Sequence, residues 1–309
     1  DGYVGKPPEL GTDVFGMSRA RGSGTLKPDY LSSFPVDFIL HRQFAQQDDW
    51  AASARLIQGK YVEPNKTVAQ NSNSDYAFDY SNGWGKASWG SDRQAWMFKR
   101  HAGFDVVTYK GDGVFGHDIA HSLGKIPEMI WIKNRDNANS WATGHKGLNG
   151  GTDAWDWYVG INETSQQTND DTLFKDTYPT STHFTVGNSN QVNNSSHNYI
   201  AMLFASVDGI SKVGSYTGNG STTGPVITTG FAPRLIMIKR SSGDGDWYIL
   251  DTLRGLTSSS NKLLKLNDDD AQSNPSSVYV EPSSTGFQLK VGYLHYNSNN
   301  EKYIYYAHA

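Results

Sequence analysis

The clearest feature of the chain is a series of short apolar runs separated by polar, glycine-rich stretches. Residues 129–133 (MIWIK) and 235–239 (LIMIK) are almost continuously apolar, and residues 36–40 (VDFIL) form a weaker version. Short runs of this kind are typical of strands that are buried on both faces. The 32 glycines indicate many turns. Since long amphipathic helical patterns are missing, we predict an all-β chain.

These runs belong to a larger pattern that recurs along the chain. Residues 103–113 (GFDVVTYKGDG) and 209–220 (GISKVGSYTGNG) each open on glycine and an apolar residue, contain a tyrosine, and close on Gly-Asp/Asn-Gly. A proline-containing apolar run with a basic end precedes a tryptophan at nearly constant distance, giving Trp50, Trp141 and Trp247. We therefore predict three tandem copies of a unit of roughly 90 to 100 residues. The recurring tryptophan is interpreted as part of the core of each unit.

The repeated landmarks also predict domain boundaries. Residues 1–27 are expected to form an N-terminal arm or the end of an earlier unit, and residues 28–110 the first and most diverged unit. Residues 111–217 and 218–309 are the predicted second and third units. Many short strands separated by turns favour a β-sandwich in each unit, with a jelly-roll or lectin-like layout.

Charge and composition exclude several classes of protein. The net charge of -4 provides no broad basic face for nucleic acid. The absence of cysteine excludes disulfides and thiol chemistry, which is compatible with folding in a reducing cytoplasm, including that of an infected host. The chain lacks an apolar run long enough to predict a membrane-spanning helix.

Aromatic residues that occur in one copy of the repeat are candidates for a binding surface, because residues repeated in every copy usually serve the fold. The chain has 9 tryptophans and 17 tyrosines, and aromatic rings in polar loops can stack on sugars or on a partner protein. One candidate lies in the run DAWDWYV (residues 153–159), which we expect to form a strand. The predicted aromatic surface consists of Trp84, Trp89, Trp155, Tyr293, His295 and Tyr296.

Two acidic turns are weaker candidates for a calcium site, since carboxylate oxygens are the ligands that calcium prefers. The candidate ligands are Asp244, Asp246, Asp268 and Asp270. Their spacing does not match an EF-hand, so solvated turns are the alternative. No other cofactor is predicted. Glutamate is scarce, and the chain has no G-x-S-x-G, P-loop or HExxH motif, so we assign no catalytic residue.

Several motifs in order resemble a repeat found in virion and tail-fibre proteins of tailed bacteriophages, many of them marine. They include GFDVVTYKGDG, HSLGKIPEMIWIKNR, TGFAPRLIMIKR and KYIYYAHA, and the resemblance extends over residues 95–309. It implies a structural or adhesive role without a catalytic motif. Trp247, Asp251 and Arg254 follow the W…D…R pattern of this repeat, and we interpret Asp251 and Arg254 as a structural pair that anchors a turn. The second unit departs from the pattern at residues 144–146.

The resemblance predicts a non-catalytic protein of a phage tail fibre or surface appendage, made in the host cytoplasm and located on the virion surface. Its expected partners are further copies of itself, in a trimer, together with other virion proteins and a host-surface glycan. One alternative is a carbohydrate-binding lectin or a glycan-degrading enzyme such as a glycoside hydrolase, which requires paired carboxylates or calcium beside tryptophan rings. Another is a capsid decoration or filament subunit.

Overall fold

The computed structural model describes residues 10–22, 26–293 and 295–309. The prediction of an all-β chain is confirmed: the described strands pair in antiparallel sheets, and the one α-helix among these residues, α1 (Asp171–Phe174), has four residues. None of the helices in this part of the chain has the length and hydrophobicity of a transmembrane span.

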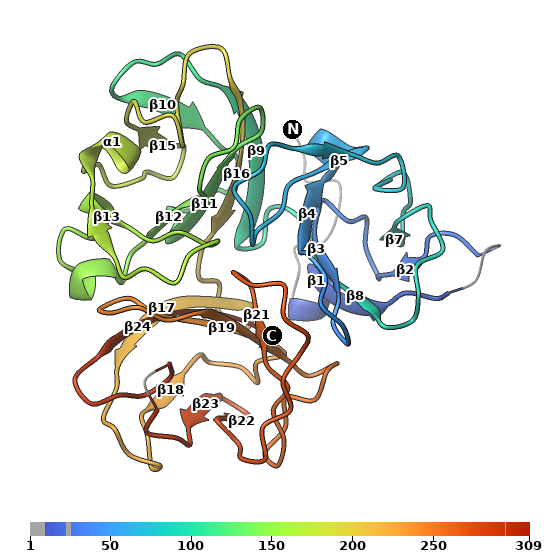
Figure 1. The fold of residues 1–309 in the computed structure, drawn as a ribbon, viewed down its shortest axis with the longest axis vertical. Helices are drawn as coiled ribbons and strands as arrows, with labels where there is room; N and C mark the ends of the chain where they lie inside the picture. The colour runs from blue at the N-terminus through green and yellow to red at the C-terminus, as the bar shows by residue number, and fades with distance from the viewer. Residues whose placement is uncertain (1–9, 23–25, 294) are drawn as a thin grey trace.

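Three larger sheets form the body of the molecule (Figure 1). The first has the order β1-β8-β3-β4, with strands β1 (Phe15–Arg19), β3 (Phe38–Gln43), β4 (Ala51–Ala54) and β8 (Arg93–Phe98). The second has the order β12-β11-β16-β9, with strands β9 (Phe104–Lys110), β11 (Met129–Asn134), β12 (Ala142–His145) and β16 (Asn198–Phe204). The third has the order β17-β24-β19-β20-β21, with strands β17 (Ser211–Thr217), β19 (Leu235–Arg240), β20 (Trp247–Asp251), β21 (Leu264–Lys265) and β24 (Lys302–His308). We call residues 15–98, 104–204 and 211–308 the first, second and third segments.

Smaller sheets accompany each larger one. They are formed by β2 (Tyr30–Leu31) with β7 (Gly83–Trp84), β10 (His117–Ala120) with β15 (His183–Val186), and β18 (Val226–Thr228) with β23 (Gly286–Leu289) and β22 (Val280–Ser283). Two short hairpins add β5 (Lys60–Tyr61) with β6 (Asn71–Ser72) and β13 (Trp157–Tyr158) with β14 (Thr168–Asn169). Figure 1 shows the three segments, in blue, green and orange to red, arranged around a common centre.

Both faces of each larger sheet are buried, which explains the continuous apolar runs. Successive side chains of a strand point to opposite faces. One face, represented by Leu40, Trp131 and Met237, contributes to a single hydrophobic cluster shared by all three segments. The opposite face packs within each segment, with Ile39 and Ile236 as examples from the first and third. The segments therefore have separate outer cores and one common inner core.

Hydrogen bonding groups the strands differently from the predicted boundaries. Strands β9 and β17 end at residues 110 and 217, where those boundaries were placed. Each of them pairs along its length with the last strand of its own segment, β16 or β24, and so belongs to the unit on the far side of the predicted boundary. Strand β1 comes from the predicted N-terminal arm and pairs with β8 of the first segment. The rest of the predicted arm includes residues 1–9 and 23–25, which lie outside the described residues.

The three recurring tryptophans are buried as predicted, and they also connect the segments in a ring. Each indole N–H donates to a carbonyl oxygen of another segment. These bonds run from Trp50 Nε1 to Lys265 (2.7 Å), from Trp141 Nε1 to Glu63 (3.0 Å) and from Trp247 Nε1 to Gly160 (2.9 Å). The first segment thus contacts the third, the second contacts the first, and the third contacts the second, which closes the ring.

A second ring is made by buried cationic side chains at matching positions of β3, β11 and β19. Arg42 donates to the carbonyl oxygens of residues 268–270 in the third segment. Lys133 Nζ donates to the Thr67 carbonyl (3.0 Å), and Lys239 Nζ donates to the Thr164 carbonyl (2.8 Å). Burial lowers the pKa of Arg42 to about 10 and that of both lysines to about 8. These contacts satisfy donors that would be costly to bury alone.

Buried histidines make the fold sensitive to acid. Burial lowers the pKa of His145 and of His308 to about 3, and lowers the pKa of His41 well below its ordinary value of 6.5. Nδ1 of His145 accepts from the Gly147 amide (2.9 Å), so protonation of that atom would break a buried hydrogen bond. As the pH falls below 6.5, the unfolded chain binds protons that the folded chain does not, and stability is lost down to about pH 3.

We expect the free energy of unfolding to fall by about 1.4 kcal/mol per pH unit for each of these three histidines below pH 6.5. Urea titrations at about pH 7 and pH 5 should therefore differ by roughly 6 kcal/mol. His145→Gln should remove about a third of the difference. Equal stability of the wild type at the two pH values would contradict this account.

Candidate functional site

A pocket of about 450 Å³ opens in the third segment, and we call it the tyrosine pocket. Its volume lies within the range of small-molecule sites. It is lined by Tyr248, Leu263, Lys265, Ser273, Tyr279, Tyr293, His295 and Tyr296. Strand β20 contributes Tyr248, while Tyr279 directly precedes β22 and Tyr293 and Tyr296 follow β23. The fold therefore brings together four tyrosines from three separate stretches of the chain.

The tyrosine rings meet at steep angles and form an aromatic enclosure. Tyr279 lies 5.3 Å from Tyr296 and 5.7 Å from Tyr293, between ring centroids, with interplanar angles of 69° and 78°. Tyr248 lies 4.6 Å from Tyr296 at 38°. Edge-to-face contacts of this kind hold aromatic rings in fixed orientations. The enclosure is thus built before any ligand enters.

Two buried polar atoms of this pocket lack partners. Among the described residues, neither Tyr296 Oη nor His295 Nδ1 has a hydrogen-bond partner. Tyr296 is 1% exposed, and burial raises the pKa of its phenol well above its ordinary value. A buried polar group without a partner is unfavourable by roughly 1 to 3 kcal/mol. A ligand that hydrogen-bonds to both atoms would remove this cost.

Three of the predicted aromatic candidates lie in this pocket, though in different environments. Tyr293 is 57% exposed and lies at the rim, and His295 is half-buried. Tyr296 is buried, so its interpretation as a surface residue is wrong, because Tyr248 and Tyr279 cover its ring. Tyr248 and Tyr279 were not predicted from the sequence. Tyr248 directly follows a recurring tryptophan, whereas alanine follows the other two, as Ala51 and Ala142. This difference could have marked Tyr248 as a residue specific to the third segment.

A second pocket, of about 260 Å³, lies at the corresponding place of the first segment, and we call it the acidic pocket. It is lined by His41, Asp48, Asp49, Trp50, Ala51, Tyr61, Glu63, Asn73, Tyr76, Trp89 and Arg93. The two places correspond because the Glu63 carbonyl accepts from the Trp141 indole just as the Lys265 carbonyl accepts from the Trp50 indole. Glu63 and Lys265 therefore occupy matching positions in the first and third segments. The side chain at this position is therefore a carboxylate in the acidic pocket and an ammonium group in the tyrosine pocket.

The carboxylates of the acidic pocket differ in how they are bound. Asp48 Oδ2 accepts from Arg93 (2.9 Å), and Asp49 pairs with Lys66. Glu63 Oε1 accepts from the Asn71 side-chain amide (3.0 Å), and its Oε2 lies 3.7 Å from Lys66 Nζ. Burial is the largest influence on Glu63 and raises the pKa of its carboxyl above the ordinary value.

Two other predicted surface tryptophans are buried, so the predictions for Trp84 and Trp155 are wrong. Trp84 is fully buried and stacks on Tyr30 at 4.8 Å with an interplanar angle of 4°. Trp155 is 2% exposed and packs against Phe174 at 5.5 Å. Both rings fold back onto their own segments. Trp89 is half-buried and lines the acidic pocket.

The run that contains Trp155 also differs from the predicted strand. Residues 154–156 form a 3₁₀ turn, η4 (Ala154–Asp156), and β13 (Trp157–Tyr158) follows it. Asp153 precedes the turn with a φ of 44°, in the left-handed region, which an extended strand cannot accommodate. Trp155 and Trp157 therefore do not share one strand face.

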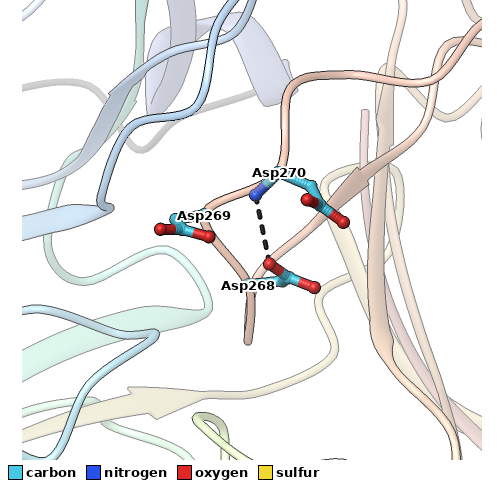
Figure 2. A group of neighbouring side chains, drawn as sticks. All are labelled: Asp268, Asp269 and Asp270. Atoms are coloured by element: carbon cyan, nitrogen blue, oxygen red, sulfur yellow. Dashed lines mark hydrogen bonds between the residues drawn. The ribbon is translucent and has the colours of Figure 1, made fainter.

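The structure does not bring the four predicted calcium ligands together. Figure 2 shows the carboxylates of Asp268, Asp269 and Asp270 on one turn, with the Asp270 amide donating to Asp268 Oδ1 (3.1 Å). An oxygen of each lies within 4.8 Å of the others, and neither Asp244 nor Asp246 belongs to this group. Asp244 Oδ1 instead accepts from the Gln166 amide (3.1 Å).

A lysine neutralises part of the charge of this turn. Lys265 Nζ lies 3.1 Å from Asp268 Oδ2, 3.2 Å from Asp270 Oδ2 and 3.7 Å from Asp246 Oδ2. The carbonyls of the same turn accept from Arg42 of the first segment. The turn is thus part of the contact between the first and third segments. Asp268 and Asp270 have Lys265 as their partner, and Asp269 Oδ2 accepts from the side-chain amide of Gln47 in the first segment (3.0 Å).

The predicted structural pair of Asp251 and Arg254 is confirmed. Arg254 Nε lies 2.6 Å from Asp251 Oδ2, and both side chains are fully buried. The Arg254 amide also donates to Asp251 Oδ1 (2.9 Å), which fixes the turn that follows β20. Asp251 accepts two further bonds from the first segment, from Gln94 Nε2 (3.2 Å) and from Trp96 Nε1 (3.1 Å).

Comparison with known proteins identifies a family for most of the chain. The family model described as a domain of unknown function, DUF7483, matches residues 90–309, which is more than two thirds of the 309 residues. No curated protein sequence matches the chain. The matched region contains the whole tyrosine pocket, whereas the acidic pocket lies outside it except for Arg93. The chain therefore belongs to the DUF7483 family.

Proposed function

We propose that the protein is a non-catalytic structural and adhesive component of a phage virion, in a tail fibre or other surface appendage, and that its tyrosine pocket binds a host-surface glycan. The observation that carries this proposal is the pair of unpartnered polar atoms, Tyr296 Oη and His295 Nδ1, inside an aromatic enclosure. Sugar rings combine apolar faces with hydroxyl groups. Such a ligand stacks on tyrosine rings and satisfies both buried atoms.

The charge of the tyrosine pocket supports an uncharged ligand. Among the residues that line the pocket, Lys265 is the one lysine or arginine. Three carboxylates surround its ammonium group. The lysine is therefore already paired and has little remaining attraction for an anion. Ser273 adds a hydroxyl group to the lining. Hydroxyl-to-hydroxyl bonding together with aromatic stacking is the chemistry that this lining offers.

The same strand order in the three segments supports a scaffold role. In each larger sheet, the first strand pairs with the last, the last pairs with the strand that carries the apolar run, and that strand pairs with the next. We infer that the chain consists of three copies of one β-sandwich unit. Their tryptophan and cation rings join them into one body, which suits a protein that bears load on a particle surface.

Adhesion can be tested by measuring glycan binding. We expect the purified chain to bind bacterial surface polysaccharides on a glycan array, and Tyr293→Ala to weaken the binding about tenfold through loss of a stacking face. Tyr293 is exposed at the rim, so the change should leave the fold intact. Tyr178→Ala, at an exposed tyrosine of the second segment, is the matched control. Binding that survives Tyr293→Ala and Tyr248→Ala together would rule out this pocket.

The assembly can be tested by light scattering. We expect a mass three times that of one chain, since fibres gain rigidity from symmetric bundling. Addition of a calcium chelator should leave the mass unchanged, because Lys265 already pairs with Asp268 and Asp270. A strictly monomeric chain at high concentration would count against the fibre. Dissociation by the chelator would instead support the aspartates as calcium ligands.

The location can be tested on particles. Immunogold labelling of virions with an antiserum raised against this chain should mark the tail fibres or another surface appendage. Labelling confined to disrupted particles would place the protein inside the virion and contradict the adhesive role.

A further inference from the structure

The acidic pocket carries an unbalanced negative charge. The charged side chains that line it are three carboxylates, Asp48, Asp49 and Glu63, and one guanidinium group, Arg93. Lys66 adds a second positive charge through its contacts with Asp49 and Glu63, and its side chain is 41% exposed. The Arg42 guanidinium over the Trp50 ring also attracts Asp48, but its hydrogen bonds go to the carbonyls of residues 268–270. The ion pairs within the pocket thus leave one of the three carboxylates without a basic group of its own.

Glu63 is the carboxylate with the weakest hold on a basic group. Asp48 pairs with Arg93 and Asp49 with Lys66, whereas Glu63 shares Lys66 with Asp49, at the longer distance of 3.7 Å from Oε2 to Nζ. The Glu63 side chain is buried, and burial raises the pKa of its carboxyl. A buried carboxylate gains most from a new charged donor, because charge-assisted hydrogen bonds are about twice as strong as neutral ones.

Aromatic rings supply the second element of the pocket. Tyr61 and Tyr76 stack at 4.7 Å with an interplanar angle of 19°, and Trp89 lies 5.9 Å from Tyr76 at 63°. Ring faces attract cations, tryptophan most strongly. Trp50 already has the Arg42 guanidinium over its ring at 5.1 Å, and Tyr76 is stacked between Tyr61 and Trp84. The ring faces available to a ligand are therefore those of Tyr61 and Trp89.

The carboxylates do not converge enough for a metal ion. Within the described residues, the acidic group whose oxygens lie within ligand distance of one another is Asp268–Asp270, and no acidic residue of the acidic pocket belongs to it. A bare cation would therefore find at most part of a coordination shell here. A larger organic cation can bind one carboxylate and the aromatic faces at the same time.

We propose that the acidic pocket recognises a primary ammonium group, as carried by an amino sugar or by a lysine side chain. The ammonium group donates to Glu63 Oε2, and its carbon skeleton packs against the rings of Trp89 and Tyr61. The third segment has Lys265 in place of Glu63, so its pocket excludes the same ligand. The two pockets thus select ligands of different charge on one scaffold.

The test is calorimetric titration of the full chain at neutral pH with two pairs of ligands. Glucosamine is compared with N-acetylglucosamine, and Nα-acetyl-lysine amide is compared with its Nε-acetylated form. We expect the free amine of at least one pair to bind about tenfold more tightly than its acetylated match. A preference in the first pair alone identifies an amino sugar, and a preference in both identifies the ammonium group itself. Equal binding within both pairs, or no binding, overturns the proposal.

Variants assign the effect to this pocket. Glu63→Gln keeps the size of the side chain and its contact with Asn71, and should abolish the preference for the free amine. Glu281→Gln, at a half-exposed carboxylate paired with Lys290 in the third segment, is the matched control and should change nothing. If Glu63→Gln retains the preference, the site lies elsewhere.

Two further measurements cover the case in which Glu63→Gln does not fold. Trp89→Leu should weaken binding of the free amine, and added salt should weaken it in the wild type. Insensitivity to both would overturn the proposal. Tyr293→Ala should have no effect on amine binding, so this test and the glycan test of the tyrosine pocket can fail independently.

Discussion

Replacing Asp251 with alanine should lower the free energy of unfolding by about 3 to 5 kcal/mol, because it leaves a guanidinium group buried without its counter-ion. Arg254 is fully buried, with its Nε 2.6 Å from Asp251. The change also removes the acceptor of Gln94 and of Trp96, both in the first segment. Urea unfolding of the wild type and of Asp251→Ala measures the loss.

A double variant separates the buried charge from simple loss of packing. Asp251→Leu combined with Arg254→Met replaces the pair with apolar side chains of similar size, and such replacements are often nearly neutral. We expect the double variant to be more stable than Asp251→Ala. A double variant that is less stable than Asp251→Ala would show that the remaining bonds of Arg254, to the carbonyls of Ile249 and Lys262, matter more than its charge.

Replacing Trp141 with alanine should lower the free energy of unfolding by about 3 to 5 kcal/mol, which is the usual range for a buried large aromatic residue. Trp141 is fully buried in the cluster shared by the three segments, and its indole donates to the Glu63 carbonyl. Because the three segments share this inner core, the loss should be felt by all of them. Circular dichroism and tryptophan fluorescence should therefore report one common, lowered transition.

The indole hydrogen bond can be separated from the packing. Trp141→Phe keeps an aromatic ring but removes the indole donor, while the Glu63 carbonyl still accepts from the Lys66 amide (3.1 Å), so we expect a smaller loss of about 0.5 to 1.5 kcal/mol. Tyr178→Ala, at an exposed ring of the same segment, should have little effect. If Trp141→Ala unfolds the second segment while the first and third keep their original transition, the ring does not couple the segments.

The sequence was informative wherever a local pattern reports burial. The run at residues 129–133 alone indicated a strand buried on both faces, and β11 (Met129–Asn134) is such a strand. The pair of Asp251 and Arg254 was predicted from the W…D…R pattern of the phage repeat that the chain resembles, and the structure has the two side chains in contact. Reasoning from a local pattern failed for Trp84 and Trp155, since a glycine-rich polar neighbourhood does not reveal that a ring folds back onto its own sheet.

By itself, then, the sequence determined the all-β class, the buried strands and the burial of the three recurring tryptophans, because each of these depends on neighbours along the chain. The Asp251–Arg254 pair followed from the resemblance to the phage repeat. Only the tertiary structure decided which segment each indole contacts and which tyrosines enclose a pocket. It also decided that Lys265 pairs with Asp268 and Asp270, and that Glu63 takes the position of Lys265 in the first segment. These features join residues up to more than two hundred positions apart, such as Trp50 and Lys265. Their geometry is fixed by the closure of three sheets around one core, which a local pattern does not encode.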